Sequence, residues 1–306
     1  MAKPLYAKII VNPYAGTGAT GRKSSRIKEI LTEAGLDFDY VYTEGKDHAV
    51  ELAREAALSG YELVVAVGGD GTLSEVVNGL IQSGHSRDIT MGILNTGTGC
   101  DFARFLDIPR DFRQACARLV NPQKVSTDVG VVQCQRGGEP FSRYFISAAS
   151  LGFDGEVVEI AEKRPRLFHG NTSYFMGVIE VMGTYRNKNV LLKMDEQTEE
   201  LRICSLVIAN AGSYASGMRI VPEADLSDGL FEVVIVGDIN KFELMQILPK
   251  AYLGGTHTNN QNIRLEKASY ITVESEDRVL IQADGDLVGE APAQFCLLPS
   301  ALNIAL

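Results

Sequence analysis

In the first 127 residues, the pattern of apolar positions switches repeatedly between strand and helix periods. Mostly apolar runs at Ala7–Val11 and Thr90–Leu94 predict strands, and the nearly continuous run Tyr61–Val67 is typical of a central parallel strand covered on both faces. The aromatic residues at alternate positions of Phe38–Tyr42 share one side of a period-two pattern, which predicts a further strand with that side buried.

Segments of helical period separate these strands. The apolar residues of Leu73–Ile81 fall at i, i+3, i+4, i+7 and i+8, which predicts an amphipathic helix. Three further helices are predicted around Ile27–Ala34 with Gly35 as the cap, over Ala49–Ser59 and over Asp101–Val120. Strands that alternate with helices indicate an α/β domain with a doubly wound, mainly parallel sheet.

Beyond Thr127 the pattern is mainly that of strands. The predicted strands are Val129–Cys134, Arg143–Ala149, Val190–Met194, Leu201–Asn210, Leu230–Val236, Ala268–Ser275 and Val279–Ala283. Two helical regions interrupt them, Glu156–Tyr185 and Lys241–Leu253, the second with Asp238 as a possible cap. The pattern therefore predicts an α/β domain at 1–127 and a β-rich, sandwich-like domain at 128–291. A tail at 292–306 could add a strand to either domain.

Composition narrows the class of protein. The 306 residues are 45% hydrophobic and 22% charged, as in ordinary globular proteins, and no apolar run approaches the length of a membrane span. A formal charge of −10 argues against nucleic acid as a partner and restricts contact with an anionic membrane to a local surface. The five cysteines show no metal-ligand spacing and the N-terminus has no signal-peptide pattern, so we expect reduced thiols and a cytoplasmic location. Oligomeric state stays open.

A glycine-rich loop provides the first candidate chemistry. Gly68-Gly69-Asp70-Gly71-Thr72 lies between a buried strand and a helix, where glycines let backbone N–H groups approach phosphate oxygens. Asp70 repels a phosphate but suits Mg²⁺ or a water of its coordination shell. The alternative is a tight turn whose glycines serve the backbone alone.

Several separate motifs resemble the diacylglycerol kinase catalytic-domain family, in the branch of bacterial lipid kinases, with relations to sphingosine kinases and NAD kinases. In chain order they are Ile10–Pro13 with Gly16, Gly68–Thr72 with Glu75 and Asn78-Gly79, Gly92–Leu94 with Gly97–Arg104, Ser150–Asp154, Gly217–Gly229, and Asp284-Gly285-Asp286. The resemblance spans nearly the whole chain. It implies ATP and Mg²⁺ in an interdomain cleft, and transfer of the γ-phosphoryl group to a hydroxyl of a diacylglycerol-like lipid.

The resemblance also implies site residues. The nucleotide would contact Asn12, Thr43, Gly68, Gly69, Asp70, Gly71, Thr72, Leu73, Ser74 and Thr98. Asp70 and Asp101 would organise Mg²⁺, and Asp286 would accept the hydroxyl proton. A second, structural Mg²⁺ would be held by the Asp228 carboxylate and the backbone carbonyls of Asp225 and Leu230. The alternative for this last segment is an acidic turn without metal.

Three residues depart from the family pattern. Cys100 stands where the family usually has Asn, and Asn95 where it usually has Pro. Asp286 stands where the bacterial kinases carry Glu as the proposed base, so the carboxylate is kept with one methylene less of reach.

The acceptor site is less defined by the sequence. An acyl-chain opening could be lined by Leu167, Phe168, Tyr174, Phe175, Val178, Ile179 and Met182, and anionic headgroups could meet Lys163, Arg164 and Arg166. The competing interpretation is that these apolar residues face a core and that the charges are solvated. The expected partners are thus a lipid substrate and, peripherally, a membrane surface.

Three other functions fit parts of the sequence. Gly16–Gly21 matches the dinucleotide-binding pattern, with Asp37 or Asp39 at a suitable distance, which would suit a Rossmann oxidoreductase. Against it, four residues separate the strand from the first glycine. The glycine loop also fits an NAD kinase-like enzyme, and the departure at Asp286 would suit a nucleotide-binding protein without catalysis.

Overall fold

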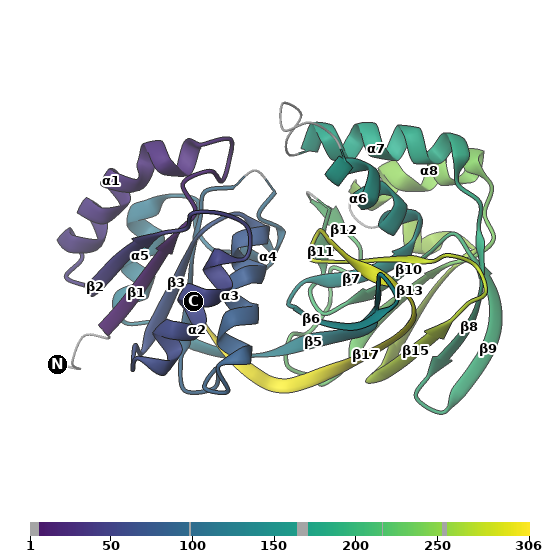
Figure 1. The fold of residues 1–306 in the computed structure, drawn as a ribbon. Coiled ribbons are helices and arrows are strands. Elements are labelled where there is room, and N and C mark those ends of the chain that lie inside the picture. Colours follow the sequence, from purple (N-terminus) through teal and green to yellow (C-terminus); the bar gives the residue numbers. More distant parts are fainter. Residues whose placement is uncertain (1–5, 98, 164–170, 216, 253–255) are drawn as a thin grey trace. The chain divides into compact units, whose positions relative to one another are not determined.

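The computed structural model describes residues 6–97, 99–163, 171–215, 217–252 and 256–306 (Figure 1). The chain divides into two compact units. Unit 1 comprises Met1–Val129 with Pro299–Leu306, and unit 2 comprises Gly130–Leu298. Within the described residues no helix is long and apolar enough to cross a membrane.

Unit 1 contains a five-stranded sheet in which each neighbouring pair is parallel. Its order is β2-β1-β3-β4-β17, with β1 at Tyr6–Val11, β2 at Asp37–Tyr42, β3 at Leu63–Gly68, β4 at Thr90–Asn95, and β17 (Asp286–Ala305) contributing its last residues. Every residue of β3 is buried, as its continuous apolar run predicts. Tyr42 was expected on a buried side but is 47% exposed, because β2 is the edge strand and has a neighbour on one side only.

The helices of unit 1 are α1 (Ala19–Glu33), α2 (His48–Leu58), α3 (Asp70–Gln82), α4 (Asp101–Phe105) and α5 (Phe112–Val120). Apolar residues of α1 and α5 pack with those of β1, β3 and β4 in one hydrophobic cluster. The single helix predicted over Asp101–Val120 was wrong. Asp107 has a positive φ of 50°, Pro109 follows, and Asp111 starts a new helix by accepting a hydrogen bond from the N–H of Gln114.

Unit 2 is built mainly from antiparallel strands. They are β5 (Lys124–Arg136), β6 (Glu139–Phe145), β7 (Ala148–Gly152), β8 (Lys188–Met194), β9 (Gln197–Ile203), β10 (Ser205–Ala209), β11 (Ser213–Tyr214), β12 (Met218–Arg219), β13 (Phe231–Val236), β14 (Ile263–Ala268), β15 (Tyr270–Glu274), β16 (Leu280–Ala283) and the first part of β17. A central sheet has the order β14-β13-β10-β7-β16-β17, and β15, β8 and β9 continue from β17. Three predicted single strands, Arg143–Ala149, Leu201–Asn210 and Ala268–Ser275, are each two strands here.

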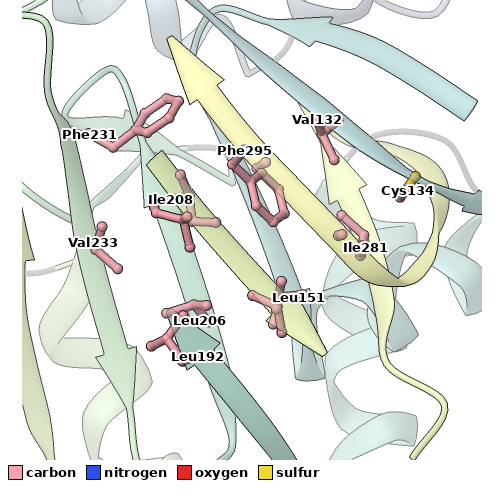
Figure 2. Packing of buried hydrophobic residues seen from close by; sticks show 14 of the residues in the cluster. Val132, Cys134, Leu151, Leu192, Leu206, Ile208, Phe231, Val233, Ile281 and Phe295 are labelled. Carbon is pink, nitrogen blue, oxygen red and sulfur yellow. The ribbon is translucent and has the colours of Figure 1, made fainter. Parts of the chain in front are cut away.

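A period of two divides the side chains of the central sheet between two cores. Leu206 and Ile208 of β10 enter a cluster with residues of β5, β8, β15 and β17, which Figure 2 shows from close by. The alternate residues Val207 and Ala209 enter a second cluster with the helices. Such alternation is what a sheet covered on both faces requires.

The second cluster is closed by α6 (Phe153–Lys163), α7 (Asn171–Thr184) and α8 (Lys241–Tyr252), and a short 3₁₀ helix, η1, follows at Thr256–Asn259. Asp238 was predicted to cap α8, but its carboxylate accepts from Asn187 instead. Asn240 accepts from the N–H of Glu243 at 3.0 Å and takes the capping role. The predicted fold class, an α/β unit with a parallel sheet and a β-rich unit, is confirmed.

Candidate functional site

The strand order of unit 1 determines where a ligand fits. In an open parallel sheet the binding crevice lies at the carboxyl ends of the strands, where the order reverses, and here it reverses between β1 and β3. Asn12 follows β1, and its Nδ2 donates a hydrogen bond of 3.0 Å to Oγ1 of Thr72, which follows β3. The two loops that flank the reversal are thus joined by side chains predicted for the nucleotide.

The glycine loop joins β3 to α3. Gly69 precedes the helix, and no side chain caps its N-terminus. The first N–H groups of a helix have no partner within it, so this end can bind an anion such as a phosphate. A Cβ on Gly68 would lie 2.3 Å from Thr72 Oγ1, so only glycine allows this turn. Leu73 and Ser74, also predicted for the nucleotide, are buried in α3.

The loop after β4 lies directly against the glycine loop. The N–H groups of Thr96 and Gly97 both donate to the carbonyl of Gly68, at 2.9 and 3.1 Å. A Cβ on Gly97 would lie 2.5 Å from the Cα of Gly69, so the backbones approach as closely as glycine permits. Thr98, which the resemblance places on the nucleotide, lies outside the described residues.

Two departures from the family pattern, Asn95 and Cys100, contact one another. The Cys100 thiol donates to Oδ1 of Asn95, and Cys100 is buried with a left-handed φ of 56°. Burial, followed by the charge of Asp70, raises the pKa of the Cys100 thiol to about 12. The thiol is therefore protonated at neutral pH and is a structural group rather than a nucleophile.

The two carboxylates predicted for Mg²⁺ lie on either side of Cys100 in this loop arrangement. Asp70 Oδ2 accepts from the N–H of Cys100 at 2.6 Å, and buried Asp101 is paired with Arg104 at 2.6 Å. No three His, Cys, Asp or Glu side chains gather around a possible metal position in the described part of the chain. Both carboxylates have partners within this loop arrangement, and a role of Asp70 and Asp101 toward Mg²⁺ stays a prediction.

Thr43 and Glu75 complete this edge of unit 1. Thr43 is buried directly after β2, and its N–H donates to the carbonyl of Val11 at 2.8 Å. Glu75 accepts from the N–H groups of Asp47 and Ala49, at 3.1 and 3.2 Å, at the start of α2. Glu75 thereby fixes the segment after Thr43, a role that its place in the sequence alone does not indicate.

In unit 2, Asp284 and Gly285 form the two-residue turn between β16 and β17. Both have positive φ, 48° and 90°, as in the Asp-Gly turns of tight hairpins. The Asp284 carboxylate accepts from three consecutive N–H groups of residues 146–148 at 2.9 to 3.3 Å. Asp284 is thus a fixed anchor for the turn.

The predicted base, Asp286, is the first residue of β17. Its side chain is 28% exposed, and its Oδ2 lies 3.4 Å from a guanidinium nitrogen of Arg143 on β6, which is 14% exposed. Sequence reasoning missed Arg143 because it is 143 residues away from its partner. This contact orients the Asp286 carboxylate at the start of the strand.

A buried polar network lies behind this turn. The N–H of Gly285 donates to Gln282, whose amide donates to Ser150 at 2.6 Å. Ser150 in turn bonds to Asp154, which also accepts from Ser205 at 2.7 Å. Asp154 is buried, and this desolvation raises the pKa of its carboxyl group.

The predicted structural metal site lies at a third place, the turn before β13. Asp228 accepts from the N–H of Leu230 at 3.0 Å and from the Lys267 ammonium at 3.1 Å, and Lys267 also pairs with Glu232. Asp225 accepts from Ser227. An ion at Asp228 would have to displace or share the ammonium, so Mg²⁺ at this turn stays a prediction.

Only some of the residues predicted to meet the lipid fall in the described part. Val178 is buried, Met182 packs beside it, and Ile179 is 58% exposed. Lys163 pairs with Glu159 at 3.2 Å. Outside the described residues or side chains lie Arg164, Arg166, Leu167, Phe168, Tyr174 and Phe175.

A parallel sheet of order β2-β1-β3-β4-β17, a glycine loop at its reversal point and a β-rich second unit are the architecture of kinases with the NAD kinase-like fold. Comparison with family models agrees. Residues 6–132 match the diacylglycerol kinase catalytic domain, and residues 147–306 match the YegS C-terminal NAD kinase beta sandwich-like domain. The chain therefore belongs to the diacylglycerol kinase catalytic-domain family.

Individual relatives support this assignment. A diacylglycerol kinase of Staphylococcus carnosus is 29% identical over 298 residues, covering 97% of this chain and 94% of the relative. One of Bacillus subtilis is 28% identical over 301 residues, covering 98% and 96%. A putative diacylglycerol kinase structure from Bacillus anthracis has a TM-score of 0.78 at 22% identity, over 100% and 98% of the two chains. Yeast NADH kinase shares the fold alone, with a TM-score of 0.51 at 11% identity, over 99% and 83%.

Proposed function

We propose that this chain transfers the γ-phosphoryl group of ATP to a hydroxyl group of a diacylglycerol-like lipid. The observation that carries the proposal is the meeting of three loops at the carboxyl edge of unit 1. Asn12 bonds to Thr72, and the loop after β4 donates two N–H groups to Gly68. This arrangement leaves the uncapped N-terminus of α3 to receive phosphates.

The first part of the proposed reaction is to hold and neutralise the triphosphate. The N–H groups that begin α3 would bind phosphate oxygens, and Asp70 and Asp101 would orient waters of an Mg²⁺ that arrives with the nucleotide. When bound, the ion supplies charge neutralisation at the transferred phosphoryl group. Thr98 keeps the nucleotide role that the resemblance implies.

The second part is the transfer itself. The acceptor oxygen attacks the γ-phosphorus, the bond from that phosphorus to the β–γ bridging oxygen breaks, and ADP leaves. In this scheme Asp286 accepts the hydroxyl proton, and Arg143, 3.4 Å from its Oδ2, orients the carboxylate. The hairpin turn anchored by Asp284 holds Asp286 at the start of its strand.

The lipid acceptor is proposed from relatives and from the unit 2 helices. The curated relatives are named diacylglycerol kinases, whereas the NADH kinase resembles this chain in fold alone. A Rossmann oxidoreductase is disfavoured because β1 lies between β2 and β3, which is not the dinucleotide-binding order. NAD phosphorylation and ATP binding without transfer remain outcomes of the test.

The test is incubation of the purified chain with labelled ATP, Mg²⁺ and a total lipid extract, followed by chromatography. We expect label in a phospholipid spot that co-migrates with the product from a defined diacylglycerol. A parallel reaction with NAD as the sole acceptor should yield no labelled NADP. Label in NADP alone, or ATP binding without any labelled product, would contradict the proposal.

A further inference from the structure

Exposed apolar side chains of unit 2 are concentrated on two helices. Among its described residues, the large exposed ones on helices are Met176, Ile179, Phe242, Met245 and Tyr252, and those on strands are Leu191, Leu265 and Tyr270. Phe242 is 70% exposed, and Ile179 and Met245 are each 58% exposed. Apolar groups gathered on one surface at such exposure mark an interaction site.

The two helices present these residues from one side of the unit. Both helices, which Figure 1 shows, pack one side on the same buried cluster, through Val178 and Val181 of α7 and Ile247 and Ala251 of α8. The opposite side of each helix therefore points away from this cluster. The Lys241 ammonium at the start of α8 donates to the carbonyl of Gly183 near the end of α7, so the helices meet there. We call the outward side chains Met176, Ile179, Phe242 and Met245 the α7–α8 face.

A cationic pocket adjoins this face. Its volume is about 390 Å³, and Met182 of α7 and Leu244 of α8 are among its walls. Arg186, Arg202 and Lys241 also line it, against one acidic residue, Asp238. Asp238 lies 3.4 Å from the Arg202 guanidinium and accepts from Asn187, so the excess charge at the pocket is positive.

The charges on the two helices differ: α8 has an excess of cations, whereas α7 does not. α8 contains Lys241 and Lys250, and its one acidic residue, Glu243, accepts from the amides of Asn260 and Asn262. On the described part of α7, Glu180 is the charge that opposes an anionic partner. In a chain of net charge −10, an apolar surface beside three cations is a local match to an anionic lipid surface.

We propose that the α7–α8 face binds an anionic phospholipid membrane. Phe242 and Met245 enter the boundary of the acyl chains, and Arg186, Arg202 and Lys241 take phosphate groups at the pocket. The inference rests on the proposed function in one respect, which is that the proposed lipid acceptor resides in such a membrane. It assigns no step of phosphoryl transfer to these residues.

The chain contains no tryptophan, which permits a direct probe. Phe242→Trp introduces a single indole, and we expect its emission to shift to shorter wavelength on vesicles of phosphatidylcholine with phosphatidylglycerol. Leu58→Trp is the control, because Leu58 is 57% exposed on α2 of unit 1 and should show no shift. No shift with Phe242→Trp, or equal shifts from both positions, would overturn the proposal.

Vesicle co-sedimentation without nucleotide tests the same surface in another way. Phe242→Gln with Met245→Gln should lower partitioning about a hundredfold or more, because two large apolar side chains no longer enter the acyl boundary. Arg186→Glu should lower binding several-fold on vesicles with phosphatidylglycerol only, whereas exposed Arg54→Glu on α2 should not. Unchanged vesicle binding combined with loss of a dimer on size exclusion would assign the face to a second copy of the chain and overturn the proposal.

Kinase assays separate failure of this proposal from failure of the proposed function. With a water-soluble short-chain diacylglycerol, the double glutamine variant should keep wild-type turnover, whereas turnover of acceptor in vesicles should fall with vesicle binding. Absence of transfer to either acceptor would refute the lipid kinase function. The vesicle experiments alone would then decide whether the α7–α8 face binds a membrane. Equal turnover by wild type and variant on vesicles would contradict the role of the face.

Discussion

Asp70 Oδ2 accepts a hydrogen bond of 2.6 Å from the backbone N–H of Cys100. The residue that is predicted to organise Mg²⁺ therefore also ties the glycine loop to the loop after β4. These loops also approach closely at Gly97, where a Cβ would lie 2.5 Å from the Cα of Gly69. Loss of Asp70 would remove both a negative charge and a hydrogen-bond acceptor for Cys100, and suitable substitutions can separate these two effects.

Asp70→Asn removes the charge but keeps an oxygen that can accept from Cys100. We expect a folded protein with an unchanged melting temperature and a KM for Mg²⁺-ATP raised about tenfold or more, as for a lost charge-assisted contact. Asp70→Ala removes the acceptor as well and should also lower the melting temperature. Asp88→Asn, whose side chain is 83% exposed in the same unit, is the matched control. Equal effects of Asn and Ala on stability would show that the Cys100 contact contributes nothing.

Much of the unit 1 fold could be predicted because its signals are local. β3 is an uninterrupted apolar run, and Leu73, Val76, Val77 and Leu80 of α3 are buried as their helical spacing predicts. The strand boundaries of unit 2 were harder, since the predicted single strand Leu201–Asn210 covers the end of β9 and all of β10. They separate at Cys204, whose N–H pairs with the carbonyl of Val236 on another strand. Only the tertiary structure supplies that partner.

In the candidate site, too, features with a local signal could be predicted, and features that depend on tertiary contacts could not. The glycine loop and the Asp-Gly turn can be recognised in the sequence because their backbone geometry restricts the residue type. Three other features depend on contacts between distant side chains and loops, which no pattern in a single sequence encodes. They are Arg143 beside Asp286, Glu75 at the start of α2, and the contact of Asn95 with Cys100. Asn95 and Cys100 were separate departures in the sequence, and in the structure they are partners.

Asp286 is expected to carry the proton transfer. Asp286→Asn should lower kcat by about 10²–10⁴-fold, which is the usual rate contribution of a general base. ATP binding should be retained. Asp286→Glu keeps a carboxylate at the position and should retain measurable transfer. Glu290→Gln, on the same strand and paired with Arg278 at 3.1 Å, is the control and should keep wild-type kcat. Full turnover by Asp286→Asn would remove Asp286 from the mechanism.

Mg²⁺ at the Asp228 turn is tested by competition with Lys267. If the proposed ion is held by Asp228 and by carbonyls of Asp225 and Leu230, Mg²⁺ should raise the melting temperature and a chelator should reverse the rise. The stabilisation would approach about 2.7 kcal/mol at a hundredfold excess over Kd. Lys267→Gln removes the ammonium that lies 3.1 Å from Asp228 and should strengthen the Mg²⁺ effect. If Mg²⁺ stabilises neither protein, the Lys267 ammonium is the cation of this turn.

Asp154 predicts how stability depends on pH. Its pKa is raised in the folded protein by burial, so the folded state keeps a proton that the unfolded state loses from about pH 4 upward. The unfolded state then binds fewer protons than the folded state, and the free energy of unfolding falls as pH rises through this window. Asp154→Asn cannot ionise, yet its amide can still accept from Ser205 and Tyr214.

The measurement is denaturant unfolding of both proteins at several pH values above about pH 4. With rising pH, wild type should lose stability relative to Asp154→Asn, because only wild type must ionise a buried carboxyl group or keep it protonated. Asp111→Asn, which alters the helix cap of α5 in unit 1, controls for the removal of an acidic group that is not buried in this network. A stability difference between wild type and Asp154→Asn that is constant with pH would show that Asp154 has the same pKa in the folded and unfolded states.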